Sequence, residues 1–478
     1  MTLYLFLRIL GVLIPLLHVA GIIAAIHATL FGRTSQGAIA WALSLIFFPY
    51  VALPLYLVFG RQKFYGYVEA RRKGDRRIDH VIEKLLARLA EFKIPFPGDT
   101  RRFSAIQKFT LLPLTSGNDA RLLIDGDATF NAIFAAIDAA QSYILLQFFI
   151  VRDDNLGRDL QRRLIARAKA GVRIHFLYDE IGSFRLPSRY IAELRDAGID
   201  MQPFNTRRGW WNRFQINFRN HRKIVVADGL AAYVGGHNVG VEYVGKSPRF
   251  GHWRDTHVAV RGPAVAAVEF SFLQDWHWAT GVVLTLPAAA QPSASGNIPT
   301  IVVPSSPADD METCTFLLLA LINGAQKRLW ISSPYFVPDE TLYDALQLAA
   351  MRGVDVRILL PAVADHLLIY LSAFSYLESG ERAGVKFYRY TSGFLHQKVW
   401  LVDDDLAAVG TTNLDNRSMR LNFEITLLFA DPAFAAKTAQ MLERDFADAT
   451  PARAGDLQRR GWIFRFAVRL ARLLDPVQ

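Results

Sequence analysis

Two segments of this chain carry the same pattern of polar residues at the same intervals. The first copy comprises His221, Lys223, Asp228, Gly235 and Asn238. The second copy comprises His396, Lys398, Asp403, Gly410 and Asn413. One such pattern is a weak signal, but two copies in one chain are specific. The repetition predicts a fold built from two similar halves that face each other across one site.

The residues between the lysine and the aspartate predict how each copy is built. The runs IVVADG and VWLVDD are apolar and rich in β-branched residues, as expected of buried strands. Because side chains alternate along a strand, the histidine and the lysine two positions later point to the same face. The glycine and the small residue after it let the backbone approach a ligand closely. Two facing copies therefore place two imidazoles and two ammonium groups around an anion, which suits phosphoryl transfer.

These residue types predict distinct roles. One histidine attacks phosphorus, while the other protonates the leaving alcohol and then deprotonates the incoming one. The non-bridging phosphate oxygens are expected to be bound by Lys223, Lys398, Asn238 and Asn413. Asp228 and Asp403 belong to the motif, but we expect them to anchor the turn after each strand rather than to react.

The duplication extends beyond the motif. In both halves helices alternate with strands, which predicts β-α-β units and a largely parallel sheet. Asp255 in WRDTHVAVRGPA corresponds to Glu424 in NFEITLLFADPA, and a proline follows eight residues later in each copy. An imidazole in such a site needs an acceptor for its second nitrogen, so we expect Asp255 and Glu424 to orient the histidines. The alternative is that both carboxylates form surface salt bridges.

Changes in composition divide the chain into six segments. They are 1–63 (two transmembrane helices), 64–115 (a basic juxtamembrane segment), 116–280 (the first repeat), 281–300 (a linker), 301–450 (the second repeat) and 451–478 (a basic amphipathic helix). The last helix either lies in the bilayer interface or packs on the protein body. Just before the first motif, aromatic residues either line a lipid entrance or belong to the core; they are Trp210, Trp211 and Phe214.

The first segment contains two apolar runs, 3–27 and 37–60. Each is long enough to cross a bilayer of about 30 Å as a helix, and Pro49 and Pro54 predict a kink in the second. A cleaved signal peptide is the alternative for the first run, but a second span after a short polar loop argues against it. By the positive-inside rule, the basic residues that follow place both chain ends and the catalytic body in the cytoplasm. These residues are Arg61, Lys63, Arg71, Arg72, Lys73, Arg76 and Arg77.

Composition narrows the choice of partners and cofactors. The net charge of +10 suits either nucleic acid or an anionic membrane, and charge alone does not separate them. The single cysteine, Cys314, excludes an intramolecular disulfide, and its apolar neighbours predict a buried residue. His237, His252 and His257 match no familiar ligand spacing, and the chemistry above requires no metal or other cofactor.

The two motifs resemble the HKD motif of the phospholipase D superfamily. The surrounding sequence resembles one branch of it, bacterial cardiolipin synthase, in the stretches NFRNHRKIVVADG, YVGGHNVGVEYVG, PRFGHWRDTHVAVRGPAV, ISSPYFVPDE, FLHQKVWLVDD and GTTNLDNRSMRLNFE. The resemblance covers nearly the whole chain, including the membrane segment. One departure is Gly236, where many members have serine and the second copy has Thr411. This departure removes a hydroxyl group from the first half-site.

The resemblance implies a fold and an activity. The fold is α/β, with two tandem phospholipase D-like repeats, mixed and largely parallel sheets flanked by helices, pseudo-two-fold symmetry and an N-terminal transmembrane hairpin. The activity is phosphatidyl transfer between two phosphatidylglycerol molecules, giving cardiolipin and glycerol through a phosphohistidine. The resemblance favours His221 as the nucleophile and His396 as acid and base, and it supports Glu424 as an orienting residue.

The resemblance also implies a multi-pass protein of the bacterial inner membrane that acts on anionic phospholipid and has no nucleic acid partner. The oligomeric state stays open, since one chain carries both motifs. A membrane-tethered phospholipase D or nuclease with the same histidines is the main alternative, because water then replaces the accepting alcohol. A degenerate member acting as a scaffold is the other alternative, and the completeness of both motifs argues against it.

Overall fold

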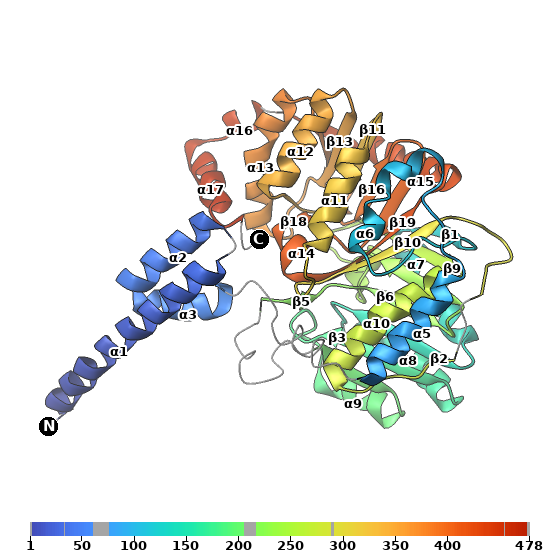
Figure 1. The fold of residues 1–478 in the computed structure, drawn as a ribbon, viewed down its shortest axis with the longest axis horizontal. Helices are drawn as coiled ribbons and strands as arrows, with labels where there is room; N and C mark the ends of the chain where they lie inside the picture. Colours follow the sequence, from blue (N-terminus) through green and yellow to red (C-terminus); the bar gives the residue numbers. More distant parts are fainter. Residues whose placement is uncertain are drawn as a thin grey trace. The chain divides into compact units, whose positions relative to one another are not determined.

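The computed structural model describes residues 2–32, 34–60, 76–204, 217–287, 291–453 and 455–475. The aromatic residues Trp210, Trp211 and Phe214 and the basic residues 61–73 lie outside the described residues, as do the side chains of Arg76 and Arg77. The chain divides into two compact units (Figure 1). One unit holds the first three helices, and the other holds both repeats.

The first unit consists of three apolar helices, α1 (Thr2–Phe31), α2 (Ser35–Phe47) and α3 (Pro49–Phe59). The part of α1 from Gly11 to Phe31 is long and apolar enough to cross a membrane. The second apolar run is not one kinked helix, as predicted, but two helices of 13 and 11 residues that meet at Phe48. Proline favours the first turn of a helix and disfavours helical geometry in the residue before it, which explains the break. Neither α2 nor α3 reaches the roughly 20 residues of a single span.

Small residues let α1 pack closely against α2 and α3. A Cβ atom at Gly21 would lie 2.3 Å from the Leu45 carbonyl oxygen, so the two helices approach where α1 has no side chain. The hydrophobic cluster between these helices consists of the buried residues Ala25, Ala28, Leu45, Ala52 and Tyr56. Other apolar side chains point outwards, and Ile23 and Val51 are 63% and 64% exposed. Such an apolar exterior is typical of membrane-associated helices.

The first repeat is built on a sheet with the strand order β1-β9-β7-β6-β2-β3-β4. Its strands are β1 (Asp119–Ile124), β2 (Tyr143–Phe148), β3 (Arg173–Asp179), β4 (Asp200–Phe204), β6 (Ile224–Ala227), β7 (Ala231–Gly235) and β9 (Thr256–Arg261). Its helices are α7 (Asp125–Ala139), α8 (Asn155–Lys169), α9 (Ser188–Asp196), the short η3 (Val241–Val244) and α10 (Ala264–Thr280).

The second repeat has the equivalent order β10-β19-β17-β16-β11-β13-β14, with β20 added at the edge. Its strands are β10 (Thr300–Ser305), β11 (Arg328–Ser332), β13 (Asp355–Pro361), β14 (Lys386–Tyr390), β16 (Val399–Val402), β17 (Leu406–Gly410), β19 (Asn422–Phe429) and β20 (Ala449–Ala452). Its helices are α11 (Thr313–Gly324), α12 (Glu340–Met351), α13 (Leu367–Arg382), α14 (Asn416–Arg420) and α15 (Pro432–Ala447). The matching orders confirm the predicted duplication.

The sheets are mixed, as predicted, but they are not largely parallel. In the first sheet β2–β3 and β3–β4 are parallel, whereas β1–β9, β9–β7, β7–β6 and β6–β2 are antiparallel. The second sheet repeats this division. The helix–strand alternation correctly indicates the parallel part. The motif itself forms an antiparallel hairpin, because a tight turn at Asp228–Gly229 joins β6 directly to β7.

Three hydrophobic cores arrange the repeats in layers. One lies between the first sheet and α7, α8 and α9, and another between the second sheet and α11, α12 and α13. The third contains residues of both sheets, among them Val234, Val258, Val409 and Leu427, together with residues of α10 and α15. The sheets therefore share one core, and their motifs belong to a single folded body. Cys314 is buried in the second repeat, as predicted.

The segment before the first repeat also packs on this body. It forms α5 (Arg76–Ala90), η1 (Gly98–Phe103) and α6 (Ile106–Phe109). Leu85 and Leu89 of α5 lie in the shared core, and Phe103 lies in the core of the second repeat. Arg102 pairs with Asp403 at 2.7 Å. This segment therefore contacts both repeats.

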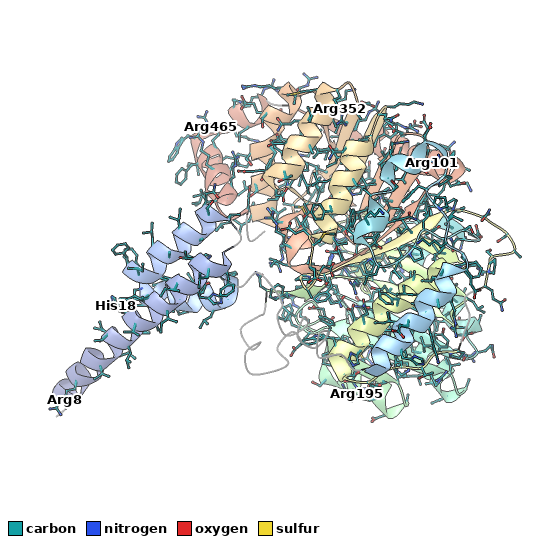
Figure 2. All side chains as sticks on the ribbon, in the orientation of Figure 1. Arg8, His18, Arg101, Arg195, Arg352 and Arg465 are labelled. Atoms are coloured by element: carbon teal, nitrogen blue, oxygen red, sulfur yellow. The ribbon has the colours of Figure 1, made fainter. Side chains whose placement is uncertain are left out.

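After β20 the chain continues into α16 (Gly455–Gln458) and α17 (Trp462–Arg472). Val468 and Ala471 are buried, and the Phe464 ring lies 5.3 Å from that of Phe374 on α13. The wide apolar face stays exposed, with Trp462 at 71% and Phe466 at 62%. Arg465 also lies at the surface (Figure 2). The helix thus packs on the body through a narrow stripe while its wide apolar face remains uncovered by the described residues.

Remaining short strands complete the structure around the motifs. They are β5 (Arg219–Asn220), β8 (Trp253–Arg254), β12 (Phe336–Val337), β15 (Phe394–Leu395) and β18 (Leu414–Asp415).

Candidate active site

Two short strand pairs bring the motifs together. β5, just before His221, pairs with β19 of the second repeat, and β15, just before His396, pairs with β8 of the first. The His221 amide donates to the Phe423 carbonyl at 3.0 Å, and the His396 amide donates to the Arg254 carbonyl at 2.8 Å. The residues after these two carbonyls are Glu424 and Asp255. Each histidine therefore lies beside the carboxylate of the other repeat.

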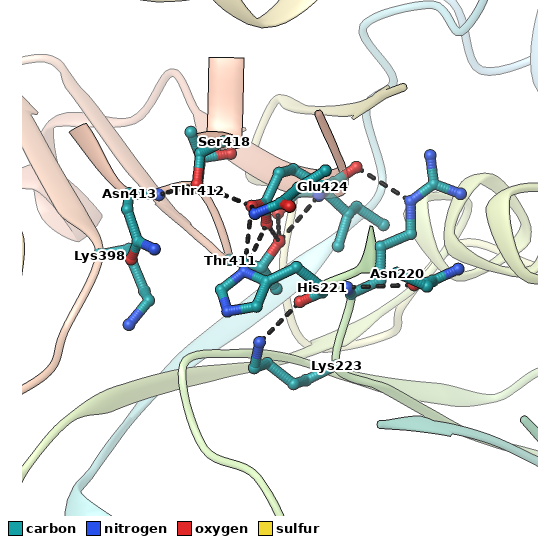
Figure 3. A network of polar contacts seen from close by, with 12 residues as sticks. Asn220, His221, Lys223, Lys398, Thr411, Thr412, Asn413, Ser418 and Glu424 are labelled. Carbon is teal, nitrogen blue, oxygen red and sulfur yellow. Dashed lines mark hydrogen bonds and ion pairs between the residues drawn. The ribbon is translucent and has the colours of Figure 1, made fainter. Parts of the chain in front are cut away.

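His221 forms the first crossed pair, with Glu424. The His221 Nδ1 atom lies 3.0 Å from both carboxylate oxygens (Figure 3). Glu424 is fully buried and also accepts hydrogen bonds from Thr411 at 2.5 Å, Ser418 at 2.8 Å and Asn422 at 3.2 Å. A carboxylate held by this many donors fixes the Nδ1–H tautomer of its histidine and leaves Nε2 free to react.

His396 forms the second crossed pair, with Asp255. The His396 Nδ1 atom lies 2.7 Å from Asp255 Oδ2, and Asp255 is fully buried. The other carboxylate oxygen accepts the Thr256 amide at 2.7 Å. Both imidazoles are nearly buried, with 8% exposure for His221 and 7% for His396.

Gly236 leaves room for Asp255, which has a shorter side chain than Glu424, its counterpart in the other repeat. A Cβ atom there would lie 2.0 Å from Asp255 Oδ1, so no side chain fits. At the equivalent position the Thr411 hydroxyl donates to Glu424. Because aspartate is one methylene shorter than glutamate, its carboxylate lies closer to the backbone, where a threonine side chain would be. Gly236 and Asp255 therefore form one combination, and Thr411 and Glu424 form the other.

Both motif lysines are buried beside their histidines. Lys223 Nζ donates to the His221 carbonyl at 2.7 Å, and the Phe149 ring lies 5.4 Å from it. Lys398 Nζ also donates to the carbonyl of its histidine, and it lies 2.9 Å from Nδ1 and 3.2 Å from Nε2 of His396. Only the second lysine is therefore in contact with an imidazole ring.

Burial controls the protonation of these groups. It lowers the pKa of His221 to about 4, although Glu424 opposes the shift. Burial and then the Lys398 charge hold the pKa of His396 well below its ordinary value. Burial also lowers the pKa of Lys223 strongly and that of Lys398 to about 8, although Asp255 and Glu424 oppose the latter shift. A bound anion would favour the protonated form of each of these groups.

The motif asparagines lie in the same site. Asn238 Oδ1 accepts the Ile150 amide at 3.0 Å, which orients its side chain. The Asn413 amide donates to Ser418 at 3.1 Å. The Asn413 side-chain oxygen is buried and has no hydrogen-bond partner in the part of the chain that the structure describes. In Figure 3 the Asn413 and Lys398 side chains lie to the left of His221, and Lys223 lies below it.

The motif aspartates contact backbone rather than the histidines. Asp228 and Asp403 both have φ of 52°, a left-handed geometry that aspartate tolerates in turns. Asp228 accepts the amides of residues 141, 142 and 143 at 2.7, 2.7 and 2.9 Å. Asp403 accepts the amides of residues 326, 327 and 328. Each aspartate thereby ties the hairpin turn to the start of the neighbouring strand.

The other histidines of the sequence pattern do not form a cluster of metal ligands. His237 Nδ1 lies 3.0 Å from His257 Nδ1, and burial lowers the pKa of each imidazole to about 3. His252 is bound instead to Asp125, at 2.9 Å. Among the described residues, no three side chains of histidine, cysteine, aspartate or glutamate are grouped to hold a metal.

Two arginines that support the carboxylates were not predicted. Arg222 Nε donates to the Glu424 carbonyl at 3.0 Å, and its guanidinium pairs with Asp275 at 2.8 Å. Arg254 donates to the carbonyl of the following residue at 2.9 Å and binds Asp445 through two nitrogens, at 2.6 and 2.8 Å. Arginine is rarely buried, and nothing in the sequence shows that these two point inward.

Comparison with known proteins agrees with this geometry. The family model described as cardiolipin synthase, PLD-like domain, matches residues 133–268 and 318–446, and one described as phospholipase D-nuclease N-terminal matches 19–61. Cardiolipin synthase A of Pseudomonas entomophila is 48% identical over 472 residues, 98% of each chain. Cardiolipin synthase A of Pseudomonas aeruginosa is 48% identical over 474 residues, 98% of this chain and 96% of that one. The crystal structure of phosphatidylserine synthase from Haemophilus influenzae has a TM-score of 0.61 at 15% identity, and the match covers 80% of this chain and all of that one.

Two α/β repeats with one His–Lys motif each, joined across a buried site, define an enzyme of the phospholipase D-like class. The structural match extends this fold to a protein of very different sequence. Within the class, the chain belongs to the cardiolipin synthase family.

Proposed function

We propose that this protein transfers a phosphatidyl group from one phosphatidylglycerol molecule to another, producing cardiolipin and glycerol. The observation that carries the proposal is the crossed pairing of His221 with Glu424 and of His396 with Asp255. It gives two imidazoles in one buried site, each held by its carboxylate through Nδ1, so that neither carboxylate occupies an Nε2 atom. A two-step transfer at phosphorus requires one nitrogen as nucleophile and one as acid and base.

In the first step His221 Nε2 attacks the phosphorus atom of the donor lipid. An N–P bond forms, and the P–O bond to the glycerol head group breaks. His396 Nε2 gives its proton to the departing oxygen, so glycerol leaves as a neutral alcohol. We assign the nucleophile to His221 because Glu424, which accepts three further hydrogen bonds, stabilises the positive charge that the ring acquires, whereas Lys398 lies within hydrogen-bond distance of the His396 ring.

His396 must carry a proton when this step begins. Burial and Lys398 keep its pKa low in the unliganded site. The phosphodiester is an anion, and its arrival opposes the Lys398 charge, so we expect proton uptake to accompany donor binding. Lys223, Lys398, Asn238 and Asn413 then bind the non-bridging oxygens and stabilise the charge of the transition state.

In the second step the terminal hydroxyl of another phosphatidylglycerol attacks the phosphohistidine. Its proton passes to His396 Nε2, the new P–O bond forms, and the N–P bond breaks. His221 is regenerated and cardiolipin leaves. Atoms and charges balance without a metal, nucleotide or redox partner.

The apolar exterior of the first helices and the exposed face of α17 support a membrane location. Trp462 and Phe466 of α17 are flanked by exposed arginines, a pattern that favours anionic lipid surfaces. We place the protein in the bacterial inner membrane as a multi-pass protein, with α1 as one crossing, α2 and α3 together as the other, and both repeats on the cytoplasmic side. The orientation rests on the basic residues after the second apolar run.

A product assay tests the proposal. Purified protein is incubated in liposomes that contain phosphatidylglycerol as the only lipid, and products are identified by mass spectrometry. Cardiolipin and glycerol in equal amounts, absent with His221→Ala, are expected. Phosphatidic acid with glycerol and no cardiolipin would make the protein a phospholipase D. Wild-type protein that forms no product, even with other phospholipids and nucleic acid offered, would contradict an enzymatic role.

A further inference from the structure

The second repeat contains a recess that its own residues line. This recess of about 280 Å³ of empty space, open solvent included, lies between β13, α13 and the segment after β11. Its lining includes the polar residues Tyr335, Asp365, His366 and Arg389. None of these residues takes part in the steps proposed above.

A tyrosine and a carboxylate are locked together in this recess. The Tyr335 hydroxyl donates to Asp365 Oδ2 at 2.5 Å, and the other carboxylate oxygen accepts the His366 amide at 2.7 Å. The Asp365 side chain is 18% exposed, so it is held in place and still reachable. An ionised carboxylate has about four acceptor sites, and these two bonds leave sites free for hydroxyl donors.

The charge of this carboxylate is felt at the second half-site. The Asp365 charge favours the protonated forms of both His396 and Lys398. It is not among the charges that act most strongly on His221. The backbone places the recess beside the second half-site, because Phe336, which follows Tyr335, pairs with Leu414, which follows Asn413.

The first repeat has no such tyrosine. The strand pairs match between repeats, since β12 pairs Phe336 with Leu414 just as Val151 bridges to Val239. One residue earlier, Tyr335 corresponds to Ile150. An apolar side chain cannot hold a carboxylate, so the recess breaks the symmetry of the duplicated site.

We propose that Tyr335 and Asp365 form the acceptor subsite, which binds the hydroxyl groups of the glycerol head group of the incoming lipid. The inference rests on the proposed function and deepens it. A polyol held by Asp365 places one hydroxyl toward His396 Nε2, which removes its proton. Water lacks a second hydroxyl that can be held in this way, so the subsite favours transfer over hydrolysis.

The rest of the recess fits the remainder of that head group. Arg389 Nη1 donates to the Pro361 carbonyl at 3.1 Å, and Arg389 Nη2 has no hydrogen-bond partner among the described residues. A guanidinium with an unused donor is suited to the phosphate of the acceptor lipid. The recess thus offers a hydroxyl acceptor and a cation, which match a phosphoglycerol group.

The test is the ratio of cardiolipin to phosphatidic acid formed from phosphatidylglycerol liposomes. In Tyr335→Phe and Asp365→Asn we expect this ratio to fall at least tenfold, while total glycerol release falls less. A variant that folds poorly makes less of both products, so the ratio is insensitive to the amount of active protein. Tyr376→Phe is the matched control, because the Tyr376 hydroxyl donates to Asp475 at 2.6 Å elsewhere in the same repeat. Its ratio should equal that of the wild type.

A second measurement uses the unmodified protein and water-soluble acceptors. Glycerol and 1-propanol are offered in equal amounts with phosphatidylglycerol, using labelled glycerol so that exchange is visible. The subsite predicts at least tenfold more glycerol exchange than propanol transfer, and Asp365→Asn should narrow the gap. Equal use of the two alcohols by the wild type, or unchanged ratios in both variants, would overturn the acceptor subsite. Wild-type protein that makes no cardiolipin would instead contradict the proposed function.

Discussion

The two half-sites have the same backbone pairing and different side-chain arrangements. In one, His221 meets a glutamate held by Thr411, Ser418 and Asn422. In the other, His396 meets an aspartate whose neighbour is a glycine, and Lys398 lies against the imidazole. The duplication therefore supplies the geometry of a symmetric site, and substitutions within it make the two imidazoles chemically unequal.

This difference separates the tasks of the two histidines. A nucleophile benefits from a firmly held carboxylate, because its ring becomes positively charged when the N–P bond forms. A group that alternates between acid and base benefits from a pKa that the substrate can shift, and the lysine beside His396 makes its pKa sensitive to a bound anion. Breaking either arrangement should therefore have distinct consequences.

The largest expected effect is the loss of either histidine. His221→Ala should lower the transfer rate by about 10⁴-fold or more, because no covalent intermediate forms. His396→Ala should lower it by about 10²–10⁴-fold. A donor lipid with a 4-nitrophenol head group separates the two, since this group leaves without a proton. With it, His396→Ala should still accumulate protein that carries a phosphatidyl group on His221, detected by intact mass, and His221→Ala should not.

The opposite labelling pattern would exchange the two roles. If the phosphatidyl group were found on His396, in the wild type or in His221→Ala, the side-chain differences described above would not govern the choice of nucleophile.

Positions 236 and 411 are equivalent in the two repeats, and exchanging their residue types tests whether glycine is needed beside Asp255. Gly236→Thr introduces a side chain whose Cβ lies 2.0 Å from Asp255 Oδ1, so the carboxylate must move away from His396. We expect kcat/KM to fall about 10²-fold or more. Thr411→Gly removes one hydrogen bond of several to Glu424, worth about 1 kcal/mol, or about fivefold in rate. Steady-state kinetics on the two variants measure the difference.

Gly236→Ala is the control for this exchange, because it adds only the Cβ atom and no hydroxyl. It should resemble Gly236→Thr. A larger loss in Thr411→Gly than in Gly236→Thr would mean that the hydroxyl, and not the space beside Asp255, distinguishes the half-sites.

Much of the fold follows from the repeated pattern. Its intervals predict two similar sheets, and the helix–strand alternation predicts the parallel strands in each. The sequence does not predict the antiparallel part, since the three residues 228–230 after β6 are equally consistent with a hairpin turn and with a loop before a crossover. It also does not predict the break at Phe48, because one proline in an apolar run either kinks or interrupts a helix.

The sequence identifies candidate residues for the site, but it does not show which carboxylate pairs with which histidine. Internal alignment equates Asp255 with Glu424 and His221 with His396, yet it is silent on which carboxylate each histidine meets. That choice depends on β5 and β15, short strands that cross to the other repeat. Ser418, Asn422 and the two buried arginines are not among the residue types that the two halves share, so only the folded structure reveals their contacts with Glu424 and Asp255.

A smaller effect is expected in the pH dependence, which reports on the lysine of the second half-site. Lys398 has its pKa lowered to about 8, so it loses its charge as the pH rises through this value. Because the charged form binds phosphate, kcat/KM should decline above about pH 8. Lys398→Arg keeps its charge at high pH, so the decline should move upward even if the maximum is lower.

The control for that profile is Lys327→Arg, at a lysine that is 74% exposed and pairs with Asp404 on the surface. It should keep the wild-type profile. An unchanged alkaline decline in Lys398→Arg would assign the titration to another group of the site.

The smallest effect is expected from substitutions in α17, the helix that follows the second repeat. The first repeat ends in α10 and a linker, whereas the second continues into α17. Trp462→Ser combined with Phe466→Ser removes two exposed aromatic rings from the wide apolar face of this helix. If that face rests on the bilayer, activity on phosphatidylglycerol vesicles should fall by up to about tenfold, since burial of each ring in lipid is favourable.

Activity in detergent micelles separates membrane contact from packing. Val468 and Ala471, which hold α17 against α13, are unchanged in the double variant, so its micellar activity should match the wild type. Met351→Ser, at an exposed position on α12, is the control and should change neither activity. Equal losses in vesicles and micelles would mean that the aromatic face stabilises the second repeat instead. Helix α17 would then stabilise the second repeat, which carries His396, and would not be the surface that contacts the membrane.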